Sequence, residues 1–155
     1  MNLRLENRVW KSLLIFLILF GIDRLTKFWI LRGFSNRAIT SFLSFDVTMN
    51  RGIAWGFFHT ESTLGFLAVT AIICLAISIM LWYAWQQLFL GKLAVAEVLV
   101  LSGAISNLVD RIVYSGVIDF IHFHLGDWSF PVFNVADVLI VLGVLWIMCT
   151  QYEKS

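Results

Sequence analysis

Long apolar stretches separated by polar connections dominate the chain. Four of them are long enough to cross a lipid bilayer, which takes about 20 residues as an α-helix; they cover about residues 12–31, 63–85, 93–113 and 131–149. The second stretch contains no charged residue, whereas the other three each carry some. The pattern predicts an all-α polytopic membrane protein, with four transmembrane helices in a single membrane domain over residues 1–155.

Two of the expected connections are long enough to hold structure of their own. They cover about residues 32–62 and 114–130. Within the first, the run AITSFLSFDVTMN is β-branched, aromatic and partly alternating, which predicts short strands. We therefore expect a small extracytoplasmic β-rich region between the first and second helices.

An even number of spans places both termini on one side of the membrane. Arg4, Arg8 and Lys11 precede the first helix and favour cytoplasmic termini, although basic residues also occur at the opposite edge. No small-residue cleavage motif follows the first apolar core, so we expect this segment to be a retained helix.

Composition excludes several classes of protein. Hydrophobic residues make up 60% of the chain and the formal net charge is +1, so no basic surface for nucleic acid is expected. Cys74 and Cys149 lie in apolar runs and indicate no disulfide framework. His122 and His124 alternate on a loop or strand without a third ligand at a recognisable spacing, so no metal site is predicted.

On this topology, the candidate site residues of the spans and connections are expected at the membrane face opposite the termini. They are Asp23, Lys27, Asn50, Gly52, Ala54, Asn107, Asp110, Arg111, Asp119, Asn134 and Asp137. Asp137 lies six residues after Pro131, which at ~1.5 Å per residue puts it about 9 Å into the expected fourth helix. A carboxylate at this depth is costly, so it indicates a function.

Helical spacing groups these residues on faces. Gly103, Asn107 and Asp110 follow an i, i+4, i+7 pattern, and Asn134 and Asp137 an i, i+3 pattern. Both faces should point into the helix bundle, where a glycine allows close helix approach.

Ion pairing accounts for some of these charges. Asp23 and Lys27, four residues apart, are expected to form a structural ion pair. Asp110 and Arg111 are expected to pair and to anchor the outer connection.

Asp119 and Asp137 have no cation expected beside them. Two buried carboxylates held close together cannot easily both ionise, so one can activate water while the other polarises a carbonyl oxygen. Buried acids also carry protons, ions and polar substrates. A small proton-coupled transporter with a relay through Asp23, Asp110 and Asp137 is therefore an alternative, and a scaffold with structural polar pairs is another.

Five short blocks resemble the signature regions of the lipoprotein signal peptidase family, the bacterial signal peptidase II. They are DRLTK (23–27), NRGIAWG (50–56), SGAISNLVDR (102–111), VIDF (117–120) and FNVAD (133–137), in the family's order along the whole chain. The resemblance implies a membrane aspartic endopeptidase without a cofactor. Such an enzyme cleaves diacylglyceryl-modified prolipoproteins just before the lipidated cysteine.

The resemblance also implies roles for individual residues. Asp119 and Asp137 correspond to the catalytic pair, and Asp23, Lys27 and Gly103 to the structural frame. The residues that bind substrate or support the site are Asn50, Gly52, Ala54, Asn107, Asp110, Arg111, Asn134 and Ala136. Ser106 stands where the family often has a glycine, directly before Asn107.

The same resemblance implies partners and a location. Membrane lipids and globomycin-type cyclic peptide inhibitors are the expected partners besides the prolipoprotein. The expected location is the bacterial cytoplasmic (inner) membrane, with several spans, cytoplasmic termini and the active site near the outer face.

Overall fold

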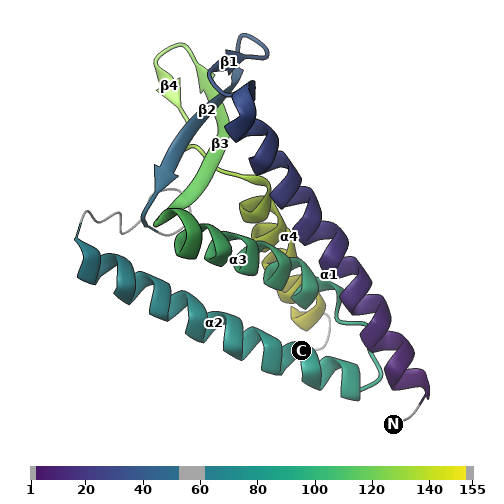
Figure 1. Cartoon of the computed structure of the whole chain (residues 1–155). Helices are drawn as coiled ribbons and strands as arrows, with labels where there is room; N and C mark the ends of the chain where they lie inside the picture. Colours follow the sequence, from purple (N-terminus) through teal and green to yellow (C-terminus); the bar gives the residue numbers. More distant parts are fainter. Residues whose placement is uncertain (1–2, 53–61, 153–155) are drawn as a thin grey trace.

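Four long helices and a small antiparallel sheet make up the computed structural model, which describes residues 3–52 and 62–152 of the chain (Figure 1). The helices are α1 (Leu3–Trp29), α2 (Thr63–Phe89), α3 (Val95–Tyr114) and α4 (Val135–Tyr152), and a short π-helix, η1 (Ile30–Phe34), continues α1. All four apolar stretches are therefore helical. Ala54, expected near the substrate, lies outside the described residues.

The helix ends differ from the predicted ones where capping or helix propensity outweighs hydropathy. α1 begins at Leu3, because its charged first turns contain no helix breaker. α4 begins at Val135 rather than near Pro131, because Asn134 caps it. Within the described residues, α2 is the one helix that is both long and apolar enough to cross a membrane by length and composition. The prediction of four spans stays a prediction.

The sheet draws on both long connections. Its strands are β1 (Arg37–Ala38), β2 (Leu43–Asn50), β3 (Val117–Leu125) and β4 (Trp128–Ser129), paired antiparallel in that order. The strands predicted between the first two helices are confirmed. The prediction was wrong in confining the β-rich region to that connection, because β2 pairs along most of its length with β3 from the second connection.

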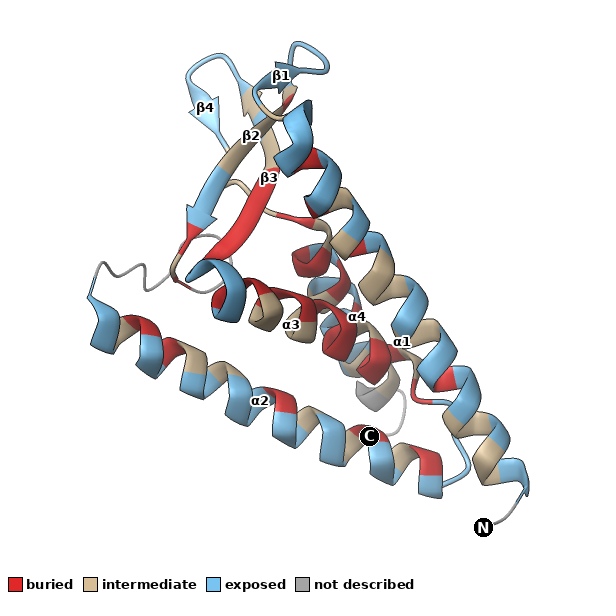
Figure 2. Ribbon diagram, in the orientation of Figure 1, coloured by how far each residue is buried: buried red, intermediate tan, exposed pale blue. Residues whose placement is uncertain are grey.

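Helix α3 lies at the centre of the helical layer and packs against α1, α2 and α4 (Figure 1). It carries more buried positions than any other element, and the first part of β3 is also buried, while the outer faces of α1 and α2 are exposed (Figure 2). Large apolar side chains such as Leu17, Leu67 and Leu75 are more than half exposed. An exposed apolar surface of this extent indicates contact with lipid or another apolar partner.

Two glycines allow α3 and α4 to approach closely. A Cβ added to Gly103 of α3 would lie 2.3 Å from the carbonyl oxygen of Ala136. A Cβ added to Gly143 of α4 would lie 2.7 Å from the carbonyl oxygen of Ala96. The sheet sits at the end of the molecule away from the start of α1 and the end of α4 (Figure 1).

Candidate active site

The first turn of α4 holds one of the two predicted acids. The Asp137 N–H donates to Oδ1 of Asn134 (2.9 Å), and the Asn134 N–H donates back to Oδ2 of Asp137 (3.3 Å). This reciprocal pair is a capping box, in which the cap residue and the third helical residue satisfy each other's free donors. Asp137 therefore lies at the very start of the helix, not six residues inside it, which corrects the predicted depth.

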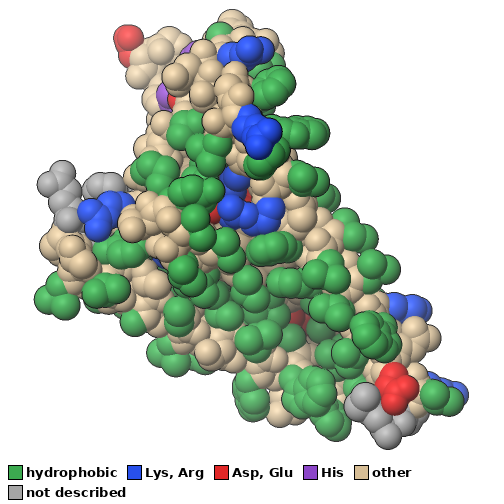
Figure 3. All heavy atoms as spheres, in the orientation of Figure 1, with side chains coloured by type: hydrophobic (Ala, Val, Ile, Leu, Met, Phe, Trp, Pro, Cys, Tyr) green, Lys and Arg blue, Asp and Glu red, His purple; other side chains and the backbone are tan. Residues whose placement is uncertain are grey.

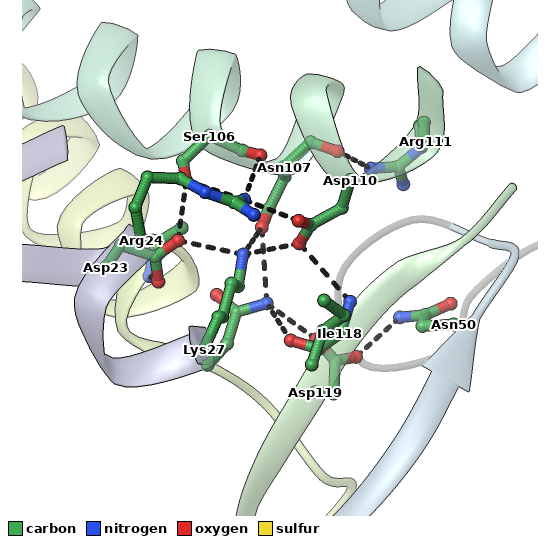
Figure 4. A network of polar contacts seen from close by, with 12 residues as sticks. Asp23, Arg24, Lys27, Asn50, Ser106, Asn107, Asp110, Arg111, Ile118 and Asp119 are labelled. Atoms are coloured by element: carbon green, nitrogen blue, oxygen red, sulfur yellow. Dashed lines mark hydrogen bonds and ion pairs between the residues drawn. The ribbon is translucent and has the colours of Figure 1, made fainter. Parts of the chain in front are cut away.

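Asp119 projects from β3 towards the same place. Its Oδ2 accepts a hydrogen bond from Nδ2 of Asn50 (3.0 Å), and its Oδ1 accepts one from Nδ2 of Asn134 (2.6 Å). Asn50 ends β2 and is held in turn, since its Oδ1 accepts from the Gly52 N–H (2.8 Å). Figure 4 shows Asn50 and Asp119 facing each other from neighbouring strands.

The pKa of Asp119 is raised from an ordinary value of 3.8 to about 7. Burial is the main cause, because it disfavours the charged carboxylate, and the negative charge of Asp137 is the second. Hydrogen bonds from Asn50 and Asn134 act in the opposite direction. Asp119 can therefore carry a proton near neutral pH.

Asn107 on α3 links Asp137 to the rest of the site. Its Nδ2 donates to Oδ1 of Asp137 (2.9 Å), while its Oδ1 accepts from Nζ of Lys27 (2.8 Å) and from Nδ2 of Asn134 (3.2 Å). One amide therefore joins α1, α3 and α4.

A buried ion cluster lies next to these amides. The predicted Asp23–Lys27 ion pair is present, with Nζ 2.8 Å from Oδ2. Lys27 also lies 2.7 Å from Oδ2 of Asp110, and Arg24 binds the other oxygen of Asp110 (Figure 4). In the described part of the chain, neither Asp119 nor Asp137 forms an ion pair.

The expected pairing of Asp110 with Arg111 is wrong. Consecutive residues on a helix point in different directions, so the two side chains separate. Besides its two cations, Asp110 accepts from the Ile118 N–H (3.3 Å). Arg111 instead donates to the carbonyl oxygens of Gly52 and Asn107 and so holds the chain after β2 against α3.

Asp23 ties this cluster to the start of α4. Its Oδ1 accepts from the Ala136 N–H (2.8 Å), and its Oδ2 accepts from the Ser106 hydroxyl (2.6 Å) as well as from Lys27. Because helix starts leave free N–H groups, Asp23 acts as a second cap on α4.

Sequence reasoning gave no role to Arg24 and no partner to Ser106. Arg24 donates to the hydroxyl and the carbonyl oxygen of Ser106 as well as to Asp110. These partners are more than eighty positions apart in the chain. No local spacing in the sequence signals such a contact.

Most of the predicted site residues lie in this one network. They are Asp23, Lys27, Asn50, Gly52, Asn107, Asp110, Arg111, Asp119, Asn134, Ala136 and Asp137. Gly103 lies beside it, against Ala136. The arrangement brings two acids to one place and surrounds them with fixed amide donors.

An apolar cavity of about 340 Å³ opens beside Asp137 between α2, α3 and α4. Asn107, Arg111 and Asp137 supply its polar lining, and side chains such as Ile77, Leu101 and Ile140 supply the rest. An extended apolar segment that enters this cavity would meet the acids at its polar end.

His122 and His124 lie on β3 at some distance along the strand from Asp119. Nδ1 of His122 is 2.7 Å from Asp46 on β2, and its Nε2 is 2.6 Å from the hydroxyl of Ser129 on β4. This contact holds three strands together. No group of three or more metal-binding side chains occurs among the residues that the structure describes.

The fold and site together define a class of helical proteins in which two acids are buried between a helix start and a small antiparallel sheet. Two solved bacterial membrane enzymes, determined by the in meso method at 2.3 and 1.9 Å resolution, have similar folds. The first has a TM-score of 0.74 and 27% identity, covering 94% of this chain and 89% of its own. The second has a TM-score of 0.72 and 26% identity, covering 95% and 96%.

The family follows from sequence comparison. A family model described as signal peptidase (SPase) II matches residues 15–152. The lipoprotein signal peptidase of Burkholderia multivorans is 40% identical over 94% of this chain and 88% of its own. That of Burkholderia vietnamiensis is 38% identical with the same coverage. The chain belongs to the signal peptidase II family, as its five sequence blocks predicted.

Proposed function

We propose that this chain removes signal peptides from diacylglyceryl-modified prolipoproteins as an aspartic endopeptidase, with Asp119 and Asp137 as the catalytic pair. The observation that carries the proposal is the bridge formed by Asn134. Its side chain binds Asp119 and its backbone binds Asp137, so one residue sets the position of both acids. Family membership supports the reaction, and the bridge supports the assignment of the acids.

A shared proton accounts for the chemistry. Burial and the charge of Asp137 raise the pKa of Asp119 to about 7, so we assign the shared proton to Asp119 and the role of base to Asp137. The first turn of a helix favours a negative charge, which suits Asp137 as the base. Asp137 takes a proton from water as the water oxygen attacks the scissile carbonyl, and Asp119 donates a hydrogen bond to the carbonyl oxygen. When the tetrahedral intermediate collapses, the C–N bond breaks and the proton on Asp137 passes to the leaving amine.

The cavity beside Asp137 suits the proposed substrate. Its apolar walls from α2, α3 and α4 match the apolar part of a signal peptide, and its polar end holds Asn107 and Arg111 beside the acid. The Asn107 side chain donates to Asp137, and Arg111 donates to the Gly52 carbonyl oxygen. These two bonds would hold the cavity walls in place as the peptide enters. Globomycin-type peptides would compete for the same space.

The proposed membrane placement has four spans with cytoplasmic termini. The sheet and the acids then lie at the outer face of the inner membrane, where water reaches the scissile bond. A proton relay through Asp23, Asp110 and Asp137 is less well supported, because the first two share Lys27 at one end of the bundle and do not form a path across it.

Cleavage of a diacylglyceryl prolipoprotein by Asp119→Asn and Asp137→Asn tests the assignment. Each amide keeps the shape of the acid but cannot exchange the shared proton. General acid–base groups contribute typically about 10²–10⁴-fold, so each variant should lose at least that factor in kcat. Asp127→Asn, at an exposed position in the turn between β3 and β4, is the matched control and should keep near-normal turnover. If Asp119→Asn or Asp137→Asn cleaves at the normal rate while still folded, the catalytic pair is misassigned.

A further inference from the structure

A second polar opening lies between α1 and the end of α3. It is a cavity of about 370 Å³ lined by Arg24, Leu25, Lys27, Phe28, Leu31 and Tyr114. It shares no lining residue with the cavity beside Asp137. In Figure 3, Lys and Arg side chains fill a hollow beside the upper part of α1, within a surface that is otherwise largely apolar.

The Arg24 guanidinium lies at this opening, and only one of its three nitrogens forms hydrogen bonds with the described residues. Every hydrogen bond that it makes comes from Nη1, to Asp110 and Ser106. Its Nε and Nη2 have no partner among the described residues, yet they are not sealed inside the protein, and the side chain is 23% exposed. A guanidinium has five N–H donors, so several of them point to the outside.

The surroundings of Arg24 are those of a lipid-facing surface. Leu25, Phe28 and Leu31 are each about half exposed along the same part of α1. Free N–H donors beside hydrocarbon are costly unless something binds them. An acceptor from the membrane itself would remove this cost.

The depth of Arg24 brings it within reach of a lipid phosphate. It lies five residues before Trp29, or ~7.5 Å along the helix. Trp29 and Tyr114 are both exposed at this end of the bundle, where aromatic residues mark the membrane interface. An arginine just below the interface extends its head towards the phosphate layer.

The charge of the pocket favours an anionic ligand. Arg24 and Lys27 are balanced by Asp23 and Asp110. Arg32 adds one more positive charge at the rim, where its guanidinium lies 4.3 Å from the centroid of the Phe28 ring. The remaining polar side chain of the lining is that of Tyr114, and no carboxylate of the described residues lines the cavity.

We propose that this pocket binds an anionic phospholipid, with its phosphate on Arg24 and Arg32 and an acyl chain along Leu25, Phe28 and Leu31. A guanidinium binds phosphate through paired N–H donors, a geometry that lysine cannot reproduce. The inference rests on the proposed placement of α1 in the bilayer. It does not depend on the catalytic assignment, since its test involves no cleavage.

Native mass spectrometry of the purified full chain in detergent tests the proposal, with phosphatidylglycerol added at increasing concentration. Phosphatidylglycerol should bind at least about tenfold more tightly than phosphatidylethanolamine or dioleoylglycerol, a difference of about 1.4 kcal/mol. Arg24→Lys should weaken binding by a similar factor, because it keeps the positive charge beside Asp110 but loses the paired N–H donors that bind a phosphate. Arg32→Gln should also weaken it, and this exposed position outside the buried cluster keeps the test valid if Arg24→Lys proves unstable.

Lys11→Gln is the matched control, since it removes one exposed positive charge from the same helix near its other end. It should leave the affinity for phosphatidylglycerol unchanged. The proposal is overturned if Lys11→Gln weakens binding as much as Arg32→Gln does, or if all three variants bind like the unmodified protein. Competition by millimolar inorganic phosphate would also overturn it, because the pocket would then be a simple anion site.

Discussion

Asn134 donates a hydrogen bond of 2.6 Å from Nδ2 to Oδ1 of Asp119, so the residue that caps α4 also holds the acid of β3. The same side chain accepts from the Asp137 N–H through Oδ1. One asparagine therefore couples the start of a helix to the geometry of the site. Asn134 therefore has two roles, one as the cap of α4 and one as a hydrogen-bond donor to Asp119.

Substitutions at Asn134 should separate these two roles. Asn134→Ser keeps a capping oxygen but loses the amide that donates to Asp119, Asn107 and the Ile118 carbonyl, so both cleavage and thermal stability should fall. Asn134→Ala loses both, and should cost about 1 kcal/mol more in stability. Cleavage rates and melting temperatures of the two variants in detergent give the comparison. Equal melting temperatures would show that the cap contributes nothing.

The raised pKa of Asp119 predicts a pH-dependent stability. Between pH 3.8 and about 7, the folded protein keeps a proton that the unfolded chain has lost. Unfolding then releases a proton, so the free energy of unfolding falls as the pH rises through this window. The melting temperature should drop from pH 5 to pH 8, and should drop less in Asp119→Asn. Parallel curves for the two proteins would rule out this contribution.

The same pKa predicts a basic limb in the activity profile. If Asp119 acts as the protonated member of the pair, kcat/KM should decline above about pH 7, by up to about tenfold per pH unit. Initial rates between pH 5 and pH 9 with a diacylglyceryl prolipoprotein measure this. A rate that keeps rising to pH 9 would contradict a proton held on Asp119.

Ser106 should stabilise the protein through Asp23. Its hydroxyl is buried and donates to a carboxylate that also caps α4. Ser106→Ala should therefore cost about 1.5–3 kcal/mol, as is typical of hydrogen bonds to charged groups. Ser102→Ala is the matched control, because Ser102 is equally buried on α3 but, among the residues that the structure describes, its hydroxyl bonds only to the Leu99 carbonyl of its own helix. If both variants unfold at the same temperature, the bond to Asp23 contributes no net stability.

The sequence carried a signal for the capping box that the helical-face interpretation overlooked. Asn134 and Asp137 have the spacing of a cap residue and its third helical residue, directly before an apolar run. Treating them only as neighbours on one face moved the expected helix start to Pro131. The charge-free second helix was predictable because nothing competes with its hydropathy.

Other parts of the site could not be read from local patterns. Lys27 meets Asn107 and Asp110 across two helices, and Arg24 takes the place at Asp110 that Arg111 was expected to fill. Such partners depend on how α1 packs against α3, which no spacing within one helix encodes. The pairing of β2 with β3 likewise joins two connections that lie far apart in the chain.

Close packing of α3 on α4 should control the position of Asp137. A Cβ at Gly103 would meet Ala136 O at 2.3 Å and Ile140 Cγ1 at 2.9 Å, so Gly103→Ala must push α3 away from the first turn of α4. Overpacking typically costs about 1–3 kcal/mol, and here it also shifts the residue next to the acid. Both the melting temperature and the cleavage rate should fall.

Gly143→Ala makes the comparison specific, because it clashes with Ala96 and Val100 of α3 at similar distances but lies six residues beyond Asp137, or ~9 Å along α4. It should lower the melting temperature by a comparable amount and reduce the cleavage rate of the folded protein much less. Gly21→Ala is the control for helix propensity, since nothing lies within 4 Å of its added Cβ, and it should be as stable as the unmodified protein or more so. If Gly143→Ala lost as much cleavage activity as Gly103→Ala at equal stability, the packing of α3 would affect α4 as a whole. The position of the first turn of α4 would then not be what controls cleavage.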